Sequence, residues 1–171
     1  MTLERAFWIF WLGGLVLFAL LAIPHGPLAI PEVPGGIFDH QVAGTAAEAG
    51  RIQRAWASAG VYENARWGMI SDLAFIGVYG IGALLGGLLF RRERDALGKL
   101  GLIIAFAAVV FLVTDYTETI AQLIQLLRGE GDDRLAGLAA TVQPVKTVAW
   151  IVSAVGLFVA IFLRRRKRSG A

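Results

Sequence analysis

The sequence contains no cysteine and only two histidines, His25 and His40, among its 171 residues. Without cysteine, disulfides, thiolate catalysis and thiolate metal sites are excluded. A haem held between helices would need an axial ligand in an apolar run, and neither histidine lies in one. The Glu-x-x-His pairs of di-iron bundles, a phosphate-binding loop and a G-x-S-x-G elbow are also missing. The sequence therefore predicts no cofactor and no metal site.

Charged residues are also scarce, at 17% of the chain, whereas 57% of the residues are hydrophobic. Soluble domains are usually about 45–50% apolar, so this composition and a mean hydropathy of +0.65 indicate an integral membrane protein. The net charge of +3 does not indicate a nucleic-acid partner, because the basic residues cluster beside hydrophobic runs. Membrane lipid is the expected surrounding.

Four apolar runs are long enough to cross the hydrocarbon core, which takes about 20 helical residues. They cover about residues 6–23, 68–90, 100–127 and 145–163. We predict an all-α fold: one membrane domain, residues 1–171, built as a bundle of four transmembrane helices. Arg5 before the first run also fits a signal peptide, but a signal core is usually only about 7–15 residues long.

Basic residues gather in the loop "RRERDALGK" and in the tail, residues 164–171, whereas the loop "RGEGDDRLAG" is net acidic. Cytoplasmic flanks of membrane spans carry the excess of Lys and Arg. We therefore predict that both termini are cytoplasmic and that the connection over residues 24–67 lies outside. The style of composition indicates a bacterial chain, for which the location is the inner membrane.

The connection over residues 24–67 divides into two parts. Its first part, "PHGPLAIPEVPGG", has four prolines and no apolar periodicity, which predicts an extended surface segment. In its second part, Thr45 and Glu48 form a capping-box pair, and apolar residues recur at helical spacing until Gly60. This pattern predicts a short amphipathic helix over about residues 45–59. Such a helix either anchors at the membrane surface or covers the outer mouth of the bundle.

The third apolar run contains two acids within "FLVTDYTETI". Asp115, Glu118, Gln122 and Gln125 follow a spacing of three, four and three residues, which places them on one helix face. An ionised side chain facing lipid at mid-bilayer costs about 2.5–3.5 kcal/mol, so this face should point into the bundle. Asp115 would lie roughly 22 Å along the helix from Leu100, in the outer third of the membrane.

Asp72 opens the second span and Lys146 opens the fourth, at the same predicted depth as the two acids. Below them, Gly82 and Gly86 form a small-xxx-small pair that permits close helix approach. We therefore predict a ligand-binding pocket in which the acids supply charge and accept protons and Lys146 is the counter-ion. Its predicted residues are Asp72, Tyr79, Asp115, Glu118, Gln122, Lys146 and Trp150.

Several functions fit this pattern. The leading one is binding, with proton-coupled handling, of a small polar or amphiphilic ligand. An accessory subunit that contacts a larger membrane protein complex is a second, and a lipid-modifying enzyme with an acid pair is a third. A metal site built from Asp39, His40, Asp115 and Glu118 is a further alternative, as is a purely structural role for the acids at the membrane boundary.

The order of "GIFDHQVAGT", "IQRAW", "SDLAFIGVY", "TDYTET" and "QPVK" resembles an uncharacterised family of small bacterial four-helix integral membrane proteins. The family pattern has an Asp-x-x-Glu motif in the third span, an acid opening the second and a lysine opening the fourth. Thr119 stands where that pattern has asparagine, and His40 and Gln41 also depart from it. The matching positions are Asp39, Thr45, Trp56, Asp72, Asp115, Glu118 and Lys146. The resemblance implies a fold but no activity.

Overall fold

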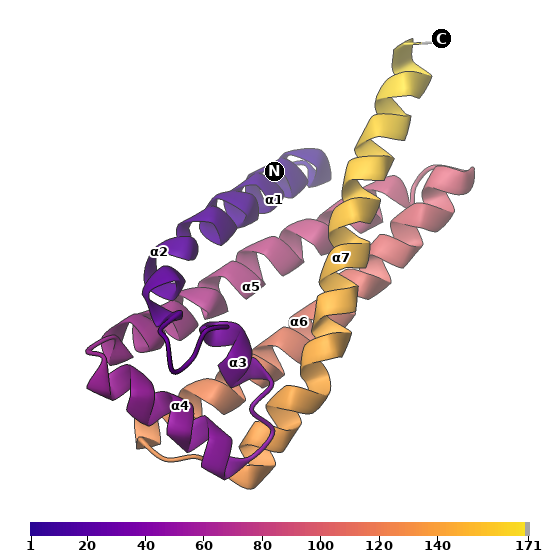
Figure 1. Ribbon diagram of the computed structural model, residues 1–171. Helices are drawn as coiled ribbons and strands as arrows, with labels where there is room; N and C mark the ends of the chain where they lie inside the picture. Colours follow the sequence, from indigo (N-terminus) through magenta and orange to yellow (C-terminus); the bar gives the residue numbers. More distant parts are fainter. Residues whose placement is uncertain (170–171) are drawn as a thin grey trace. The chain divides into compact units, whose positions relative to one another are not determined.

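The computed structural model describes residues 1–169, which are almost entirely helical (Figure 1). Four of its helical segments, Leu3–Leu28, Tyr62–Phe90, Ala96–Arg128 and Asp133–Lys167, are long and apolar enough to cross a membrane. The predicted all-α, four-helix class is therefore confirmed. The elements are α1 (Leu3–Leu20), α2 (Ala22–His25), the 3-10 helix η1 (Gly26–Leu28), α3 (Ile37–Gln41), α4 (Ala46–Ser58), α5 (Tyr62–Phe90), α6 (Ala96–Arg128) and α7 (Asp133–Ser169). The last two residues of the predicted tail, 170–171, lie outside the described part.

The fourth long helix begins at Asp133, well before the start that the sequence indicated near Val145. The Asp132 carboxylate accepts hydrogen bonds from the backbone N–H groups of Arg134 (2.9 Å) and Leu135 (3.0 Å), which caps the start of α7. Pro144 then lies inside the helix. A proline there removes one backbone hydrogen bond, and α7 continues through it to the apolar run that the sequence indicated.

The chain forms two compact units, and each long helix contributes a segment to both. The first unit consists of Met1–Val16, Ile76–Val113 and the chain from Val145 onward. The second unit consists of Leu17–Phe75 and Thr114–Pro144. The first unit packs through close helix contacts at glycines, and the second unit packs around an apolar core.

The first unit packs its helices through glycines. A Cβ atom on Gly82 would lie 2.6 Å from the backbone nitrogen of Trp11, and one on Gly14 would lie 2.6 Å from the Cα of Tyr79. Gly86 faces the side chains of Leu157 and Phe7 at similar range. Helices α1 and α5 therefore approach with backbone against backbone, as small residues allow in membrane bundles. The predicted role of Gly82 and Gly86 is confirmed.

Replacing Gly82 with alanine should force α1 and α5 apart, because the new methyl group meets backbone rather than a flexible side chain. We expect a loss of about 1–3 kcal/mol in unfolding free energy, the usual range for overpacking. The measurement is the folded fraction in mixed micelles of mild and denaturing detergent. Gly13→Ala is the matched control, since its Cβ would lie 3.5 Å from Val78 Cγ1, an ordinary contact. Equal losses for the two variants would contradict the prediction.

The second unit has an apolar core that draws on the connection after α1. Its fully or nearly buried members are Leu28, Val33, Ile37, Ile52, Trp56, Ala65, Met69 and Leu126. We call residues 21–61, which supply five of these side chains, the cap. The predicted extended surface segment is wrong: α2, η1 and a bridge between Ile30 and Val33 fold it compactly. The prolines shape turns, while Leu28 and Val33, with no exposed surface, anchor the segment in the core.

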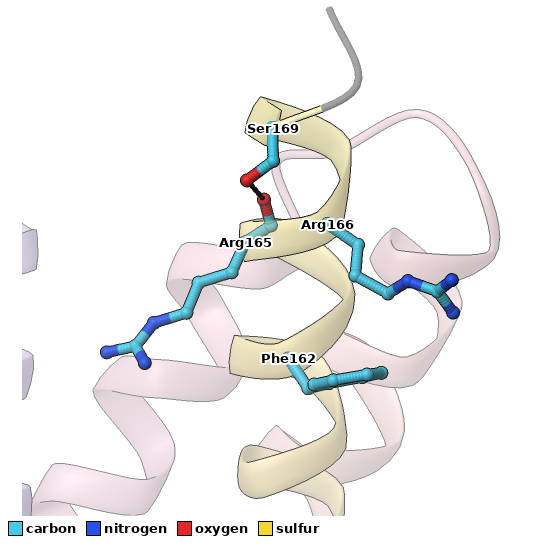
Figure 2. A pocket seen from close by; sticks show the side chains of 4 residues that line it. All are labelled: Phe162, Arg165, Arg166 and Ser169. Atoms are coloured by element: carbon cyan, nitrogen blue, oxygen red, sulfur yellow. Dashed lines mark hydrogen bonds between the residues drawn. The ribbon is translucent and has the colours of Figure 1, made fainter.

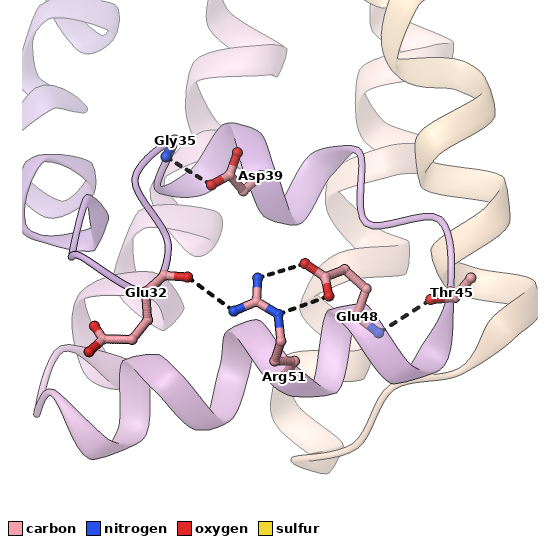
Figure 3. Close-up of polar contacts among 6 residues, drawn as sticks. All are labelled: Glu32, Gly35, Asp39, Thr45, Glu48 and Arg51. Atoms are coloured by element: carbon pink, nitrogen blue, oxygen red, sulfur yellow. Dashed lines mark hydrogen bonds and ion pairs between the residues drawn. The ribbon is translucent and has the colours of Figure 1, made fainter.

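Helix α4 forms where the sequence predicts it. The Thr45 hydroxyl accepts a hydrogen bond from the Glu48 backbone N–H (3.2 Å), and Gly60, with φ at +73°, follows the helix end. The Glu48 carboxylate does not complete the capping box; it pairs with Arg51, which also donates to the Glu32 carbonyl (Figure 3). The apolar face of α4, with Ile52 and Trp56 fully buried, packs on protein. The interpretation of α4 as a membrane-surface anchor is therefore wrong.

Candidate functional site

The polar face of α6 is buried, as its spacing predicted. Asp115 is 6% exposed, Glu118 is fully buried, and Gln122 and Gln125 are 2% and 1% exposed. All four residues belong to the second unit. We call them the acid–amide stripe. A continuous line of buried polar groups in a helix this apolar needs partners from the elements that pack on it.

Gln125 closes the end of the stripe near the α6–α7 loop. Its side-chain Nε2 donates to the Ala121 carbonyl (3.1 Å), and its Oε1 accepts from the backbone N–H of Asp132 (3.0 Å). Both ends of the amide are therefore engaged within the protein. Gln125 fixes the loop that leads into α7, which is a structural role.

Beside Gln122, which lies about one turn of α6 from Gln125, the cap contributes two further buried polar side chains. His40 of α3 is 3% exposed and Gln53 of α4 is 2% exposed. Their side-chain nitrogens, His40 Nε2 and Gln53 Nε2, are 3.2 Å apart, and the imidazole also lies 5.2 Å from the Trp56 ring, measured between ring centres. Gln122 of the stripe neighbours the same imidazole. We call His40, Gln53 and Gln122 the His40 cluster.

Burial lowers the pKa of His40 from its ordinary value near 6.5 to about 4, because the protonated ring loses its hydration. Gln122 acts in the opposite direction, by a smaller amount, through a side-chain hydrogen bond to the protonated form. At neutral pH the ring is therefore uncharged. A neutral imidazole has one nitrogen that donates and one that accepts.

The His40 cluster leaves polar atoms unsatisfied. His40 Nδ1, Gln53 Oε1 and Gln122 Nε2 are buried and make no hydrogen bond of ordinary geometry to any group in residues 1–169. An unsatisfied buried polar group costs about 1–3 kcal/mol, and native proteins contain few of them. His40 Nδ1, Gln53 Oε1 and Gln122 Nε2 thus lie on neighbouring side chains in the interior of the second unit.

Asp72 has a partner that the sequence did not indicate. Its carboxylate oxygen lies 3.3 Å from His25 Nε2, and the two side chains are only 16% and 17% exposed. The imidazole of His25 lies against Gly68, where a Cβ atom would come within 2.5 Å of the ring. Asp72 is thereby tied to the segment that follows α1. No part of the sequence pattern links these two residues.

The other predicted pocket residues, Tyr79, Lys146 and Trp150, belong to the first unit. The Tyr79 hydroxyl lies 3.1 Å from the Ser153 hydroxyl, and its ring packs edge-on against Phe111 at 5.3 Å between ring centres. Lys146 and Trp150 are half-buried. The predicted meeting of Lys146 with the acids of the second unit stays a prediction.

A metal site that includes Asp39 gains no support. The Asp39 carboxylate accepts a hydrogen bond from the Gly35 backbone N–H at 2.8 Å, which holds the turn before α3 (Figure 3). Across residues 1–169, no three carboxylate or imidazole groups gather closely enough to hold a metal ion. Asp39 therefore has a local, structural partner.

No family model, curated protein or solved structure matches the chain. The resemblance to small bacterial four-helix membrane proteins therefore stays a prediction. A function for this protein has to be inferred from the burial, the charge and the hydrogen bonding of its own residues.

The end of α7 carries the basic run from which the sequence analysis predicted a cytoplasmic C-terminus. Arg164 pairs with Glu4 (3.0 Å), and Lys167 pairs with Asp95, which lowers the pKa of that carboxyl. Arg165 and Arg166 point away from the helix in different directions beside a shallow hollow of about 510 Å³ (Figure 2). Arg164 and Lys167 thus hold the helix end in place, while Arg165 and Arg166 line the open hollow.

The hollow is lined by Phe162, Arg165, Arg166 and Ser169. Arg166 lies over the Phe162 ring, 5.6 Å from its centre, and the Ser169 hydroxyl donates to the Arg165 carbonyl (Figure 2). These contacts are all within one helix. The hollow therefore has no second element that would shape it for a specific ligand.

Proposed function

We propose that this membrane protein binds a small polar or amphiphilic ligand at the acid–amide stripe of α6. The observation that carries the proposal is the burial of Glu118, with no exposed surface, beside Asp115 and Gln122. Ionisable groups inside membrane helices are costly and commonly mark a ligand or ion pathway. The unsatisfied amide and imidazole atoms of the His40 cluster, around Gln122, add to this support.

Each residue has a chemical role in the proposal. Asp115 and Glu118 supply negative charge to the ligand and accept protons from it, and Gln122 donates a hydrogen bond. Uptake or release of a proton by a buried carboxyl changes its charge, and this couples ligand binding to pH. Asp72, which belongs to the same unit as these residues, is assigned as a further lining residue.

The proposal is tested by native mass spectrometry of the full chain, extracted in a mild detergent. We expect the wild-type protein to retain a small molecule, and Asp115→Asn combined with Glu118→Gln to lose it at least about tenfold, because a hydrogen bond to a charged group contributes about 1.5–3 kcal/mol. The matched control is Glu63→Gln combined with Glu130→Gln, two exposed acids. Circular dichroism checks that all three proteins remain folded.

Three results would contradict the proposal. One is equal retention of the small molecule by both double variants, and a second is a wild-type protein that retains none. The third is a fixed protein partner that co-purifies with every variant, which would favour an accessory subunit. A changed lipid composition in cells that overproduce the wild type, absent with the Asp115 and Glu118 variant, would instead favour a lipid-modifying enzyme.

A further inference from the structure

The charged residues of the chain are divided unequally between the two units. The first unit contains 11 of the 16 Lys and Arg residues but only three of the 13 Asp and Glu residues. Apart from Lys146, its basic residues lie near the start of α1, in and just after the loop between α5 and α6, and at the end of α7. An excess of positive charge at the ends of membrane spans attracts anionic lipid headgroups.

Two ion pairs bring these three places together. Arg164 of α7 pairs with Glu4 of α1 (3.0 Å), and Lys167 of α7 pairs with Asp95 of the loop between α5 and α6. The Arg164 guanidinium also lies over the Phe90 ring, 5.8 Å from its centre. These pairs use two of the three acids of the first unit. Most of its basic side chains therefore have no acid of the same unit to neutralise them.

Arg165 and Arg166 are the exposed basic residues beside the hollow at the end of α7. Figure 2 shows their guanidinium groups extending to different sides of the helix, with the Phe162 ring below them. Within residues 1–169, neither guanidinium forms an ion pair with a carboxylate. A guanidinium group binds phosphate oxygens through charge-assisted hydrogen bonds. Both arginines are therefore available to the phosphate of a lipid headgroup.

An exposed apolar face of α7 leads directly to these arginines. Its side chains recur at intervals of three and four residues, which places them on one side of the helix, and each is about half exposed or more. They are Ile151 (47%), Val155 (56%), Phe158 (57%) and Phe162 (58%). We call these four residues the α7 apolar face. It extends about 16 Å along the helix, which is about half of the hydrocarbon core and the depth of one acyl chain.

Contacts with α1 hold this part of α7 in place. The Trp11 ring packs edge-on against Phe158, with 5.2 Å between ring centres, and Arg164 pairs with Glu4 one and a half turns further along. Arg166 lies over the Phe162 ring at 5.6 Å, so the last apolar side chain and the first free charge are in contact. The apolar face and the two arginines thus form one continuous surface.

We propose that this surface binds anionic phospholipid. An acyl chain lies along the α7 apolar face, and the phosphate of the headgroup contacts Arg165 and Arg166. The hollow is open and is lined by one helix, so the headgroup is recognised by its negative charge rather than by a close fit. This inference goes beyond the proposed function, because the surface belongs to the first unit and the acid–amide stripe to the second.

The same features disfavour other occupants. A soluble phosphate compound would contact the arginines but would leave the α7 apolar face uncovered. A second copy of the chain, docked through the same face, would bring the two arginine pairs together, and the repulsion between like charges opposes this. A phospholipid with a net negative charge satisfies the apolar and the basic part at once.

Native mass spectrometry of the delipidated full chain in mild detergent tests the proposal. The probes are phosphatidylglycerol and phosphatidylcholine with identical acyl chains, which differ in the net charge of the headgroup. We expect the wild-type protein to bind phosphatidylglycerol at least about fivefold more tightly. Arg165→Gln combined with Arg166→Gln should weaken phosphatidylglycerol binding about five- to 25-fold, at about fivefold for each charge, and should leave phosphatidylcholine binding nearly unchanged.

The matched control is Arg54→Gln combined with Arg134→Gln. These two exposed arginines lie in the second unit, and their replacement removes the same amount of charge. The control variant should bind phosphatidylglycerol as the wild type does. Circular dichroism checks that both variants remain folded. Added salt should weaken the wild-type preference for phosphatidylglycerol, because it screens exposed charges.

Four results would overturn the inference. They are equal binding of the two lipids by the wild type, unchanged phosphatidylglycerol binding by the Arg165 and Arg166 variant, an equal loss in the control variant, and displacement of the lipid by glycerol phosphate at the same concentration. The test is also separate from that of the proposed function. Asp115→Asn combined with Glu118→Gln should leave phosphatidylglycerol binding unchanged, whether or not those acids hold another ligand.

Discussion

Replacing Trp56 with alanine is expected to unfold the cap and to lower the free energy of unfolding by about 3–5 kcal/mol. Trp56 has no exposed surface and lies in the core of the second unit with Leu28, Ile52 and Leu126. Truncation removes the ring from this core and also leaves the buried Leu28 carbonyl without its donor. The cavity would be larger than neighbouring side chains can fill.

Two measurements check this result. The folded fraction in mixed micelles gives the loss of stability, and limited proteolysis shows whether residues 21–61 become accessible. Trp67→Ala is the matched control, because the Trp67 side chain is 58% exposed. A Trp56 variant that resists protease as well as the Trp67 variant would show that the cap does not depend on this core.

The second large effect is a loss of stability in acid that depends on His40. Its pKa is about 4 in the folded protein and near 6.5 when the ring is exposed in the unfolded chain. Between these two values the unfolded state binds more protons, so the free energy of unfolding falls as the pH falls through that window. The whole shift corresponds to about 3 kcal/mol, lost below pH 4 and fully regained above pH 6.5.

Thermal or detergent unfolding at about pH 7.5 and about pH 4.5 measures this loss. We expect the wild-type protein to lose about 2–3 kcal/mol more than His40→Gln between the two conditions, because glutamine does not titrate. Carboxyl groups that titrate near the lower pH are common to both proteins and cancel in the comparison. Parallel pH profiles for the two proteins would show that His40 is not buried as a neutral ring.

The elements with strong periodic patterns were predictable from the sequence. Apolar length predicts the four long helices, Thr45 and Gly60 mark the ends of α4, and the spacing of Asp115 and Glu118 predicts their burial. These signals are local: each depends on residues within a few helical turns. The same is true of Gly82 and Gly86, whose spacing indicates close packing before any partner is known.

The cap was not predictable in the same way. Leu28 and Val33 are buried by residues far along the chain, and no periodicity in a proline-rich segment indicates this. His40 and Gln53 come from two short helices, so their approach depends on tertiary packing. The pairing of His25 with Asp72, which lies on the next long helix, has the same origin. A single histidine in a sequence does not indicate which residue its side chain will contact.

Two hydrogen bonds in the second unit join residues that are far apart in the sequence. The backbone N–H of Ala46 donates to the Asp133 carboxylate (2.7 Å), and the Tyr62 hydroxyl donates to the Leu126 carbonyl. The nascent chain therefore lacks these two contacts, and the contribution of Leu126 to the core around Trp56, until residue 133 has left the ribosome. At 5–20 residues per second, the delay after residue 56 is about 4–15 s. Early termination of translation within that interval would leave a second unit that lacks Leu126 from its core.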